Sequence, residues 1–560
     1  MDLDIIHFSN YIYAYAVSND ELNVRIRLRS KVYDNIKVYY KNLYDHSKNI
    51  YSKNMIMILD DGIHSLYEAT IQIKERHFKY YFELSQGLKT IAYTADGLIK
   101  EPASVNYFYY PAINDDEIIT LPGWAEGEII YQILVDRFYD GDAANNPKNV
   151  KSIDALPDRN TYYGGDFVGI IKKMDYIKSL GVKIIYLSPL FLSPTYHKYD
   201  VSDYYKIEDT YGGTVGLINL VETAHRNGIK VILDCVFNHC SAENELFQDV
   251  IKYGEASLYK DWFYIESFPI DIKRCNYDTF AGEVPSMPKF NTSNPDVINY
   301  LTDVAVHWTK TLDLDGWRLD VADEVSMCFW REFRRKVKAV KPEVLIIGEV
   351  WNHASKWMQG DQFDTVTNYK YRKWLVDFIC GNINSSMFWQ KISGNKMLYK
   401  TPSFNYLVNL IGSHDTIRFR TLVDNEKLHY LALLLTLTLD GMPLIYYGDE
   451  VGLEGQVDPD NRRAFRWNDI NKEELKLIQS IGKLRESSTA LKKGETIPLK
   501  SDERVLAFRR KYGNDMITVV LNFSNKVKKM KFNIQKVLYG ELSVKNDSVY
   551  VQPYSIIIGL

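Results

Sequence analysis

Cysteine is scarce in this 560-residue sequence, and no two cysteines are spaced as a metal-binding or redox pair. The five thiols are odd in number and include no C-x-x-C motif, so neither a disulfide framework nor a thiolate metal site is implied. We expect Cys235, Cys240, Cys275, Cys328 and Cys380 to be reduced. Residues 1–21 also lack the basic stretch and the sustained apolar run of a secretory signal, which indicates a cytoplasmic protein.

An excess of charge and a long hydrophobic run are also missing. Lys and Arg number 68 against 72 Asp and Glu, which leaves a net charge of -4 and gives no electrostatic case for binding nucleic acid or an anionic membrane. No stretch approaches the roughly 20 apolar residues that a membrane-spanning helix needs. The balance favours a neutral or small polar substrate.

Tryptophan is absent from the first 115 residues, which read instead as short strands separated by turns. Alternation such as VRIRL and YYFEL, with breaks at Asp60-Asp61-Gly62 and Gln86-Gly87, predicts an N-terminal β-sandwich. The expected strands are Asn23–Leu28, Ile36–Tyr40, Tyr67–Ile73, Lys79–Leu84 and Thr90–Thr94. A packing or dimerisation module is more consistent with this segment than a sugar platform.

From Trp124 the pattern changes to strands that mostly alternate with helices, such as those expected at Gly169–Leu180 and Thr214–Asn227. Eight apolar strands over roughly 350 residues predict an α/β fold, a (β/α)8 TIM barrel. The expected strands are Ile129–Ile133, Lys183–Leu187, Val231–Asp234, Gly316–Asp320, Leu345–Glu349, Phe363–Thr367, Leu407–Ile411 and Leu444–Tyr447.

The remaining segments complete the predicted domain organisation. Residues 240–291 are too many for an ordinary loop between strand and helix and contain several aromatic residues, so we expect a small folded insertion after the third strand. After about Arg485 strands return at Val505–Arg509, Met516–Leu521 and Val549–Ile558. We therefore predict a β-sandwich at 1–115, a barrel at 116–485 with the insertion 240–291, and a C-terminal β-sandwich at 486–560.

Polar residues follow many of the predicted barrel strands, and the pair Arg318 and Asp320 is central among them. In Gly316–Val321 a period of two places both side chains on the same face, where the guanidinium is expected to hold the carboxylate ionised and oriented. A structural ion pair is the alternative. Asp320, Glu349 and Asp415 follow the fourth, fifth and seventh strands, and a barrel brings such ends together on its catalytic face. Carboxyl groups gathered there acquire different pKa values, as glycosidic bond cleavage requires.

Four segments then reveal a resemblance. VILDCVFNH (231–239), GWRLDVADEV (316–325), IIGEVW (346–351) and LIGSHDT (410–416) resemble, in order and spacing, the signature regions of the α-amylase family of glycoside hydrolases. MPKFN (287–291) resembles a further signature of the neopullulanase, cyclomaltodextrinase and maltogenic amylase branch, although Phe290 replaces the usual Leu. GDQFDTVTNY (360–369) and DPDNRR (458–463) point to the same branch. The similarity extends from roughly Trp124 to Trp467 and more loosely through both terminal β domains.

The resemblance implies a catalytic role for each of the three acids. Asp320 is expected to be the nucleophile, Glu349 the general acid/base, and Asp415 a residue that binds sugar hydroxyls as the ring distorts. The further residues that the resemblance implies in substrate binding are Arg318, His239, His414, Asp234, His197, Tyr199, Asp458, Arg462 and Trp351. Packing beneath the cavity rim is an open alternative for Trp351.

The segment DGDAANN (140–146), with Gly164 and Asp166, offers closely spaced oxygen ligands of the kind Ca2+ prefers. It resembles a calcium site of the neopullulanase branch, with Asp140 and Asn146 in swapped positions relative to the usual Asn and Asp. The expected ligands of a structural Ca2+ are Asp140, Asp142, Asn145, Asn146, Gly164 and Asp166. A hydrophilic loop without metal is equally compatible with the residues, and no organic cofactor is expected.

The sequence thus predicts a retaining α-glucan hydrolase that cleaves α-1,4 bonds in cyclodextrins, maltooligosaccharides and pullulan. Cleavage of α-1,6 bonds and transglycosylation remain open. An α-1,6-glucosidase or a trehalose-active enzyme of the same superfamily is one alternative, and a non-catalytic sugar-binding relative is another. The expected partners are an α-glucan oligosaccharide and, through the N-terminal domain, a second copy of the chain in a homodimer.

Overall fold

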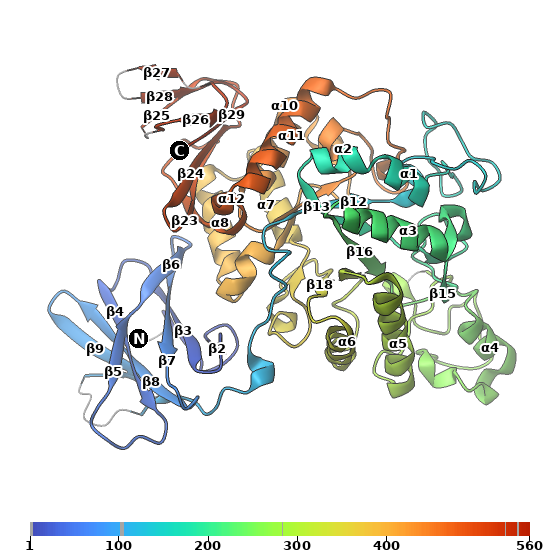
Figure 1. The fold of residues 1–560 in the computed structure, drawn as a ribbon. Coiled ribbons are helices and arrows are strands. Elements are labelled where there is room, and N and C mark those ends of the chain that lie inside the picture. The colour runs from blue at the N-terminus through green and yellow to red at the C-terminus, as the bar shows by residue number, and fades with distance from the viewer. Residues whose placement is uncertain (1–3, 101–105, 283, 532–533, 542, 546–547) are drawn as a thin grey trace. The chain divides into compact units, whose positions relative to one another are not determined.

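The computed structural model describes residues 4–100, 106–282, 284–531, 534–541, 543–545 and 548–560, shown as a ribbon in Figure 1. The chain forms two compact units. One contains residues 1–121, 353–361 and 386–404, and the other contains residues 122–352, 362–385 and 405–560.

The first unit contains the predicted N-terminal β-sandwich. One sheet has the order β1 (Ile5–Ile6), β3 (Glu21–Arg29), β7 (His64–Gln72) and β6 (Ile56–Asp60), with β2 (Ala14–Ala16) paired to β3. The other has the order β10 (Gly97–Ile99), β9 (Lys89–Thr94), β8 (Phe78–Gln86), β4 (Asn35–Asn42) and β5 (Tyr51–Asn54), with β11 (Phe108–Tyr110) paired to β8. All five strands predicted in this region are present.

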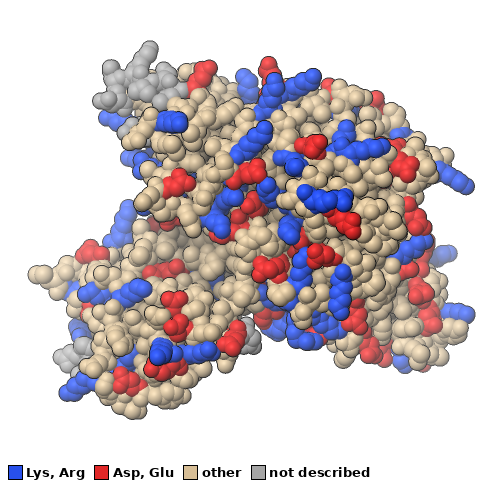
Figure 2. Space-filling view, in the orientation of Figure 1, with Lys and Arg blue, Asp and Glu red and all other residues tan. Residues whose placement is uncertain are grey.

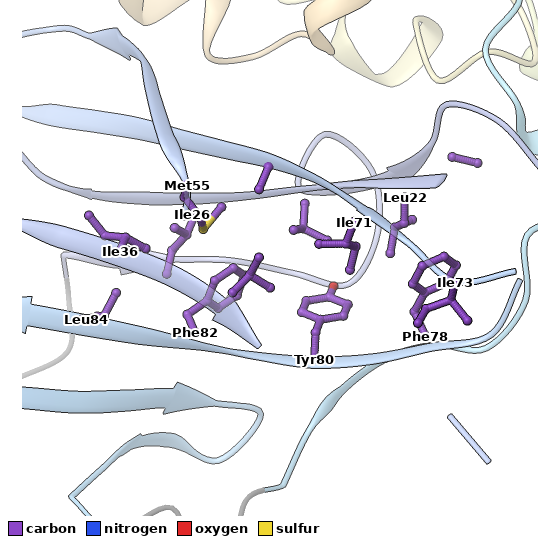
Figure 3. Close-up of a cluster of buried hydrophobic side chains, with 14 of the residues drawn as sticks. Leu22, Ile26, Ile36, Met55, Ile71, Ile73, Phe78, Tyr80, Phe82 and Leu84 are labelled. Carbon is purple, nitrogen blue, oxygen red and sulfur yellow. The ribbon is translucent and has the colours of Figure 1, made fainter. Parts of the chain in front are cut away.

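The sandwich core follows from the alternation in the strands. Ile26 and Ile71 from one sheet and Ile36 and Phe82 from the other are at most 1% exposed and belong to the same buried cluster, part of which is shown in Figure 3. Because successive strand residues point to opposite faces, VRIRL contributes its apolar residues to this core and presents its arginines on the other face. The buried Arg25 there donates to Glu68 Oε2 at 2.7 Å and to Tyr399 O at 2.6 Å. Residues 386–404 are thereby held to the same unit.

The second unit contains the barrel. Its sheet has the order β19 (Thr365–Val366), β18 (Leu345–Gly348), β17 (Gly316–Leu319), β16 (Lys230–Cys235), β13 (Val182–Leu187), β12 (Ile129–Ile133), β21 (Met442–Tyr446) and β20 (Val408–Leu410), and every neighbouring pair is parallel. A parallel bridge between Thr367 and Val408 joins the two ends of this order. The sheet is therefore closed into the predicted (β/α)8 barrel.

Helices surround these strands (Figure 1). They are α1 (Phe167–Lys172), α2 (Met174–Ser179), α3 (Gly213–Arg226), α5 (Pro295–Leu312), α6 (Met327–Val340), α7 (Tyr369–Ile379), α9 (Phe419–Val423), α10 (Glu426–Thr438), α11 (Lys472–Ser487) and α12 (Thr489–Lys493). Helix α8 (Ser385–Lys396) belongs, apart from its first residue, to the first unit. The single helix predicted at 169–180 is wrong, because the structure breaks it at Lys173 between α1 and α2. There the Lys173 ammonium lies 4.0 Å from the ring centroids of both Tyr139 and Trp467. No glycine or proline marks this break.

Residues 240–291 form the expected folded insertion. Helix α4 (Glu245–Tyr253) packs Phe247 against Phe263 and Tyr277, with ring centroids 4.9 Å apart in both pairs. Isolated β-bridges hold the insertion together, and one of them, between His239 and Lys289, connects its C-terminal part to the segment that follows β16. A short hairpin of β14 (Phe191–Leu192) and β15 (Asp203–Ile207) precedes this region.

The C-terminal β region consists of two sheets. One has the order β22 (Glu495–Pro498), β23 (Val505–Tyr512), β24 (Asp515–Asn522), β29 (Ser555–Gly559) and β26 (Val537–Tyr539), and the other has the order β25 (Lys528–Met530), β28 (Ser548–Val551) and β27 (Ser543–Lys545). The single strand predicted at 549–558 is wrong. Pro553 has no backbone N–H to donate and Tyr554 has φ 49°, so the chain turns there and passes from one sheet to the other.

The surface carries charges of both signs. On the face shown in Figure 2, Lys and Arg side chains are interspersed with Asp and Glu, as the near-zero net charge of the sequence suggests. Over the described ranges, no helix combines the length and the hydropathy required to cross a membrane.

Candidate active site

Three neighbouring barrel strands direct their carboxyl ends toward one arginine. Asp234 lies in β16, Arg318 in β17, and Asp320 and Glu349 directly after β17 and β18. Arg318 Nη1 donates to Asp320 Oδ1 at 2.8 Å and to Asp234 Oδ1 at 3.0 Å, while Nη2 lies 2.6 Å from Glu349 Oε1. The arginine is 2% exposed. One buried guanidinium therefore fixes three carboxyl groups that are far apart in the sequence.

The turn after β17 brings the two predicted catalytic carboxyl groups together. Val321 N donates to Glu349 Oε2 at 3.0 Å, so the backbone next to Asp320 is bonded directly to the side chain of Glu349. Val321 has φ 45°, a left-handed conformation that is costly for a β-branched residue. The surrounding hydrogen bonds thus maintain a strained backbone at this position.

These groups open into a cavity of about 500 Å³ at the carboxyl end of the barrel. It is lined by His197, Tyr199, His239, Phe280, Ala281, Met287, Asp320, Val321, Asp323, Glu324, Glu349, Trp351, Asp415, Asp458 and Arg462. Nine of the twelve residues predicted for catalysis or substrate binding are in this wall. The other three, Asp234, Arg318 and His414, lie behind it. Arg318 and His414 contact carboxyl groups of the wall, and Asp234 contacts Arg318 and the hydroxyl of Tyr199.

Asp415 enters the cavity from the loop after β20. It lies 3.1 Å from His414 Nε2 through Oδ2 and 3.5 Å from Arg462 Nη2 through Oδ1. Its side chain is 29% exposed, more than that of Asp320 or Glu349. Asp415 is thus the most accessible of the three acids.

Burial dominates the electrostatics of the acids. It raises the pKa of Glu349, Asp415 and Asp234 and raises that of Asp320 well above its ordinary range, with Arg318 acting in the opposite direction on all four. The expectation that Arg318 lowers the pKa of Asp320 overall is therefore wrong. One cation shared among several buried carboxyl groups does not offset their loss of hydration and mutual repulsion.

The histidines of the site are neutral. Burial lowers the pKa of His239 to about 3 and that of His197 to about 4, and lowers that of His414 well below its ordinary value. Gln132 Nε2 donates to His414 Nδ1 at 2.7 Å, which places the ring hydrogen of His414 on Nε2, facing the Tyr199 hydroxyl oxygen and Asp415. A neutral imidazole in this tautomer is a hydrogen-bond donor toward the cavity acids.

Tyrosines form much of the site, and sequence reasoning missed most of them. The predicted Tyr199 stacks on His414 with ring centroids 5.2 Å apart and donates to Asp234 Oδ2 at 2.9 Å. Tyr369, which was not predicted, stacks on Trp351 at 3.8 Å with an interplanar angle of 3°, and its hydroxyl donates to Glu349 Oε1 at 3.5 Å. Trp351 is 45% exposed, so packing beneath the rim does not bury it.

The other residues that the sequence reasoning missed are Tyr186, Tyr196, Phe280, Asp323 and Glu324. Tyr186 donates to the Asp234 carboxylate, and Phe280 lies with its ring centroid 4.8 Å from that of His239. A single tyrosine or phenylalanine in a 14% aromatic sequence gives no local signal of such a role. Asp323 and Glu324 stand inside GWRLDVADEV and could have been identified from their proximity to Asp320.

The predicted calcium loop contains buried oxygen atoms without partners. Asn145 Oδ1 and Asn146 Oδ1 accept no hydrogen bond from any described residue. A Cβ at position 164 would lie 2.3 Å from Asn146 Oδ1, so only glycine fits there. By contrast, the Asp166 side chain already accepts from Gly169 N at 2.6 Å and from Asp142 N at 2.8 Å.

The unpartnered oxygens of this loop are therefore the amide oxygens of Asn145 and Asn146, while the carboxylates of Asp140 and Asp142 accept from Asn146 Nδ2 and Ala144 N. Among the residues that the structure describes, no group of three His, Cys, Asp or Glu side chains is arranged to hold a metal ion. Unpartnered buried amide oxygens fit an oxygen-seeking cation such as Ca2+, whereas they exclude a thiolate or imidazole site.

The comparisons with known proteins agree with this geometry. Residues 132–495 match the model of the α-amylase catalytic domain, and residues 1–114 match that of the α-amylase N-terminal Ig-like domain. The chain is 41% identical to a cyclomaltodextrinase of Thermoanaerobacter pseudethanolicus over 98% of both chains, and 39% identical to neopullulanase 2 of Thermoactinomyces vulgaris over 92% of this chain and 90% of that one.

The fold of this chain is also similar to that of solved structures. A solved cyclomaltodextrinase superposes with a TM-score of 0.93 at 34% identity, covering 100% of this chain and 99% of the other. Membership of one family accounts for the barrel, the N-terminal sandwich and the acid cluster at the strand ends together. The chain belongs to the α-amylase family of glycoside hydrolases.

Proposed function

We propose that this protein is a retaining α-glucan hydrolase that cleaves α-1,4-glucosidic bonds of cyclodextrins, maltooligosaccharides and pullulan. The observation that carries the proposal is the pair Asp320 and Glu349, bound to the two amino nitrogens of one buried guanidinium at the wall of the 500 Å³ cavity. Glycosidases use such a pair of carboxyl groups, and membership of the α-amylase family supports the retaining mechanism. The names of the relatives, cyclomaltodextrinase and neopullulanase, support the substrate class.

In the proposed reaction, Asp320 attacks the anomeric carbon while Glu349 gives its proton to the departing glycosidic oxygen. Burial raises the pKa of Glu349, so this carboxyl group retains its proton closer to neutral pH, as an acid requires. Burial also raises the pKa of Asp320, so the division of roles rests on the family motifs and not on the pKa values. The positive charge that develops on the sugar in the transition state favours the ionised form of Asp320. Water then hydrolyses the covalent glycosyl-enzyme after Glu349 removes its proton, and the anomeric configuration is retained.

The remaining wall residues are assigned to binding. Asp415, with His414 behind it, and His239 and His197 face hydroxyls of the reacting sugar, and Tyr199 supplies an apolar face. Asp458 and Arg462 hold the next sugar on the non-reducing side. Trp351 and Tyr369, stacked at 3.8 Å, form a flat surface next to Glu349 on which the leaving group can rest.

The decisive experiment compares Asp320→Asn with the control Asp303→Asn on β-cyclodextrin, pullulan and maltotriose; Asp303 is an exposed acid of α5 that pairs with Lys336 outside the cavity. Turnover should fall by on the order of 10⁴ in the first variant and by less than about tenfold in the second, because only Asp320 is bonded to Arg318 as a nucleophile. Proton NMR of the first product should show the α-anomer. Turnover of Asp320→Asn equal to that of wild type, or a β-anomer, would disprove the mechanism.

The same substrate set distinguishes the alternatives. Cleavage of isomaltose or trehalose without action on cyclodextrin and pullulan would identify an α-1,6-glucosidase or a trehalose-active enzyme. Maltose binding by calorimetry without any turnover would identify a non-catalytic sugar-binding relative.

We further propose that the loop 140–146 holds a structural Ca2+ through Asn145, Asn146, Asp140, Asp142 and the neighbouring residue Gly164. The support is the pair of buried amide oxygens without partners. A bound ion would neutralise the loop carboxylates and stiffen the chain that leads to α1. A chelator should therefore lower the melting temperature, and added Ca2+ should restore it.

We also propose a cytoplasmic homodimer. The five cysteines, all in described positions, are unpaired, which suits a reducing compartment. The edge strand β6 carries Ile56 at 70% and Met57 at 51% exposure, an apolar surface that a second copy would cover.

The dimer is tested by Ile56→Glu, with Leu88→Glu as the control because Leu88 is fully exposed in a turn. Sedimentation should give a monomer for the first variant and a dimer for the second. A monomeric wild type, or an unchanged dimer in Ile56→Glu, would contradict the proposal.

A further inference from the structure

Tyr196 is a buried residue whose hydroxyl contacts two residues of the cavity wall, Asp458 and Arg462, which also contact each other. The hydroxyl donates to Asp458 Oδ1 at 2.7 Å and accepts from Arg462 Nη1 at 3.1 Å, and Arg462 Nη1 is itself 3.1 Å from the same Asp458 oxygen. Tyr196 is 1% exposed and is not among the residues that line the cavity. It therefore touches two wall residues without itself reaching a ligand.

The ring of Tyr196 packs against the buried guanidinium of Arg137. Arg137 lies between two tyrosines, with its guanidinium carbon 4.5 Å from the ring centroid of Tyr196 and 4.7 Å from that of Tyr163. None of its guanidinium nitrogens has a hydrogen-bond partner among the described residues, and its nearest charge is Asp136 Oδ2 at 3.3 Å. The cation is thus held by the ion pair with Asp136 and by the two rings, and its position against the Tyr196 ring restricts that ring.

Without the Tyr196 hydroxyl, Asp458 would keep Arg462 as its partner and lose one of its two contacts. The Asp458 side chain is 38% exposed and contacts Tyr196 and Arg462. Arg462 also donates through Nε to His414 O at 3.0 Å and approaches Asp415 at 3.5 Å, so it is anchored on the barrel side. Asp458 is the member of the pair whose position depends on the tyrosine.

We propose that Tyr196 is a positioning residue that fixes the Asp458–Arg462 pair and thereby sets the preference of the enzyme for substrates with a second glucose on the non-reducing side of the cleaved bond. The inference rests on the proposed function, which places that glucose against this pair. Burial raises the pKa of Tyr196 to about 12, so the hydroxyl keeps its proton and remains a donor to Asp458 over the working pH range.

The test uses two chromogenic substrates that differ by one glucose, 4-nitrophenyl α-glucoside and 4-nitrophenyl α-maltoside. In Tyr196→Phe the ratio of kcat/KM for maltoside over glucoside should fall about tenfold, the scale expected for losing a hydrogen bond to a carboxylate, while kcat/KM for the glucoside stays within about twofold. A general loss of structure would lower both values together.

Tyr163→Phe is the matched control. Tyr163 stacks on the same arginine, but its hydroxyl donates to Ala155 O at 2.6 Å and does not contact Asp458. This variant should leave the ratio unchanged. A ratio in Tyr196→Phe within about twofold of wild type, or an equal fall in both variants, would overturn the proposal.

Two further measurements separate this inference from the proposed function. If Tyr196 acts through Asp458, Tyr196→Phe should have little additional effect in an Asp458→Ala background, whereas full additivity would overturn the inference. Calorimetry with maltose needs no turnover: affinity should fall about tenfold in Tyr196→Phe and remain unchanged in Tyr163→Phe. An inactive wild type would end the proposed function, and the maltose affinities would still decide the role of Tyr196.

Discussion

Replacing Arg318 by methionine should shift the pH–rate profile to higher pH, since Arg318 is the cation shared by Asp234, Asp320 and Glu349. It lies 2.8 Å from Asp320 Oδ1 and 2.6 Å from Glu349 Oε1. At an effective dielectric constant of about 20, unit charges about 4 Å apart attract by about 4 kcal/mol, which corresponds to about three pKa units at 1.36 kcal/mol each. Because three carboxyl groups share the cation, we expect a shift of at least about one unit for each catalytic group.

The direction of the shift follows from the two roles. The acid limb of kcat/KM reports ionisation of Asp320 and the alkaline limb reports loss of the Glu349 proton, and both pKa values rise when the cation is removed. The whole bell should therefore move to higher pH by about one to three units. At neutral pH, activity should fall at least about 100-fold, because Asp320 is then protonated and no longer oriented.

A second buried arginine provides the control. Arg334 in α6 pairs with Asp364 at 2.7 Å, and neither residue lines the cavity. Arg334→Met should lower the melting temperature without moving either limb of the profile. Kinetics measured from pH 4 to pH 10 on a chromogenic maltoside would decide the matter. Limbs of Arg318→Met that coincide with those of wild type would refute the electrostatic reasoning.

Three more outcomes follow from single contacts. Burial raises the pKa of Glu450 to about 7 from 4.5, so the folded protein binds the proton more tightly than the unfolded chain. The free energy of unfolding therefore declines as pH rises from about 4.5 to about 7. Glu450→Gln should remove about 3 kcal/mol of this decline, measured by urea unfolding at pH 4 and pH 8. Gly164 has φ 78° and no room for a Cβ beside Asn146, so Gly164→Ala should lower the free energy of unfolding by about 1 to 3 kcal/mol, and an unchanged midpoint would contradict the geometry. Trp351→Ala should raise KM for maltotriose about fivefold by removing the surface stacked on Tyr369, with little change in Tm, and an unchanged KM would assign the ring to packing.

The acid cluster shows where sequence patterns are informative. Asp320 and Glu349 are the residues that directly follow β17 and β18, and the sequence places them there because strand polarity and the alternation of strands with helices bring all such ends to one face. The pattern could not give the direction of the pKa shift of Asp320. That direction depends on burial and on how many carboxyl groups share Arg318, and both are properties of the packed barrel.

Where a local signal was weak or overlooked, the predictions failed. Nothing in the sequence marks the break at Lys173, which coincides with contacts to the rings of Tyr139 and Trp467. Pro553 did mark the break between β28 and β29, because a proline without a backbone N–H predicts the end of a strand inside a sheet.

The sequence by itself determined the barrel, the flanking β regions and the three acids, because strand periodicity and short motifs are local properties of the chain. Only the tertiary structure decided that one guanidinium binds three carboxyl groups, that Tyr369 supports Trp351, and that Tyr196 joins Asp458 to Arg462. Tyr196 and Asp458 are separated by 262 positions in the chain, and their contact exists only when the barrel brings together the loops that carry them.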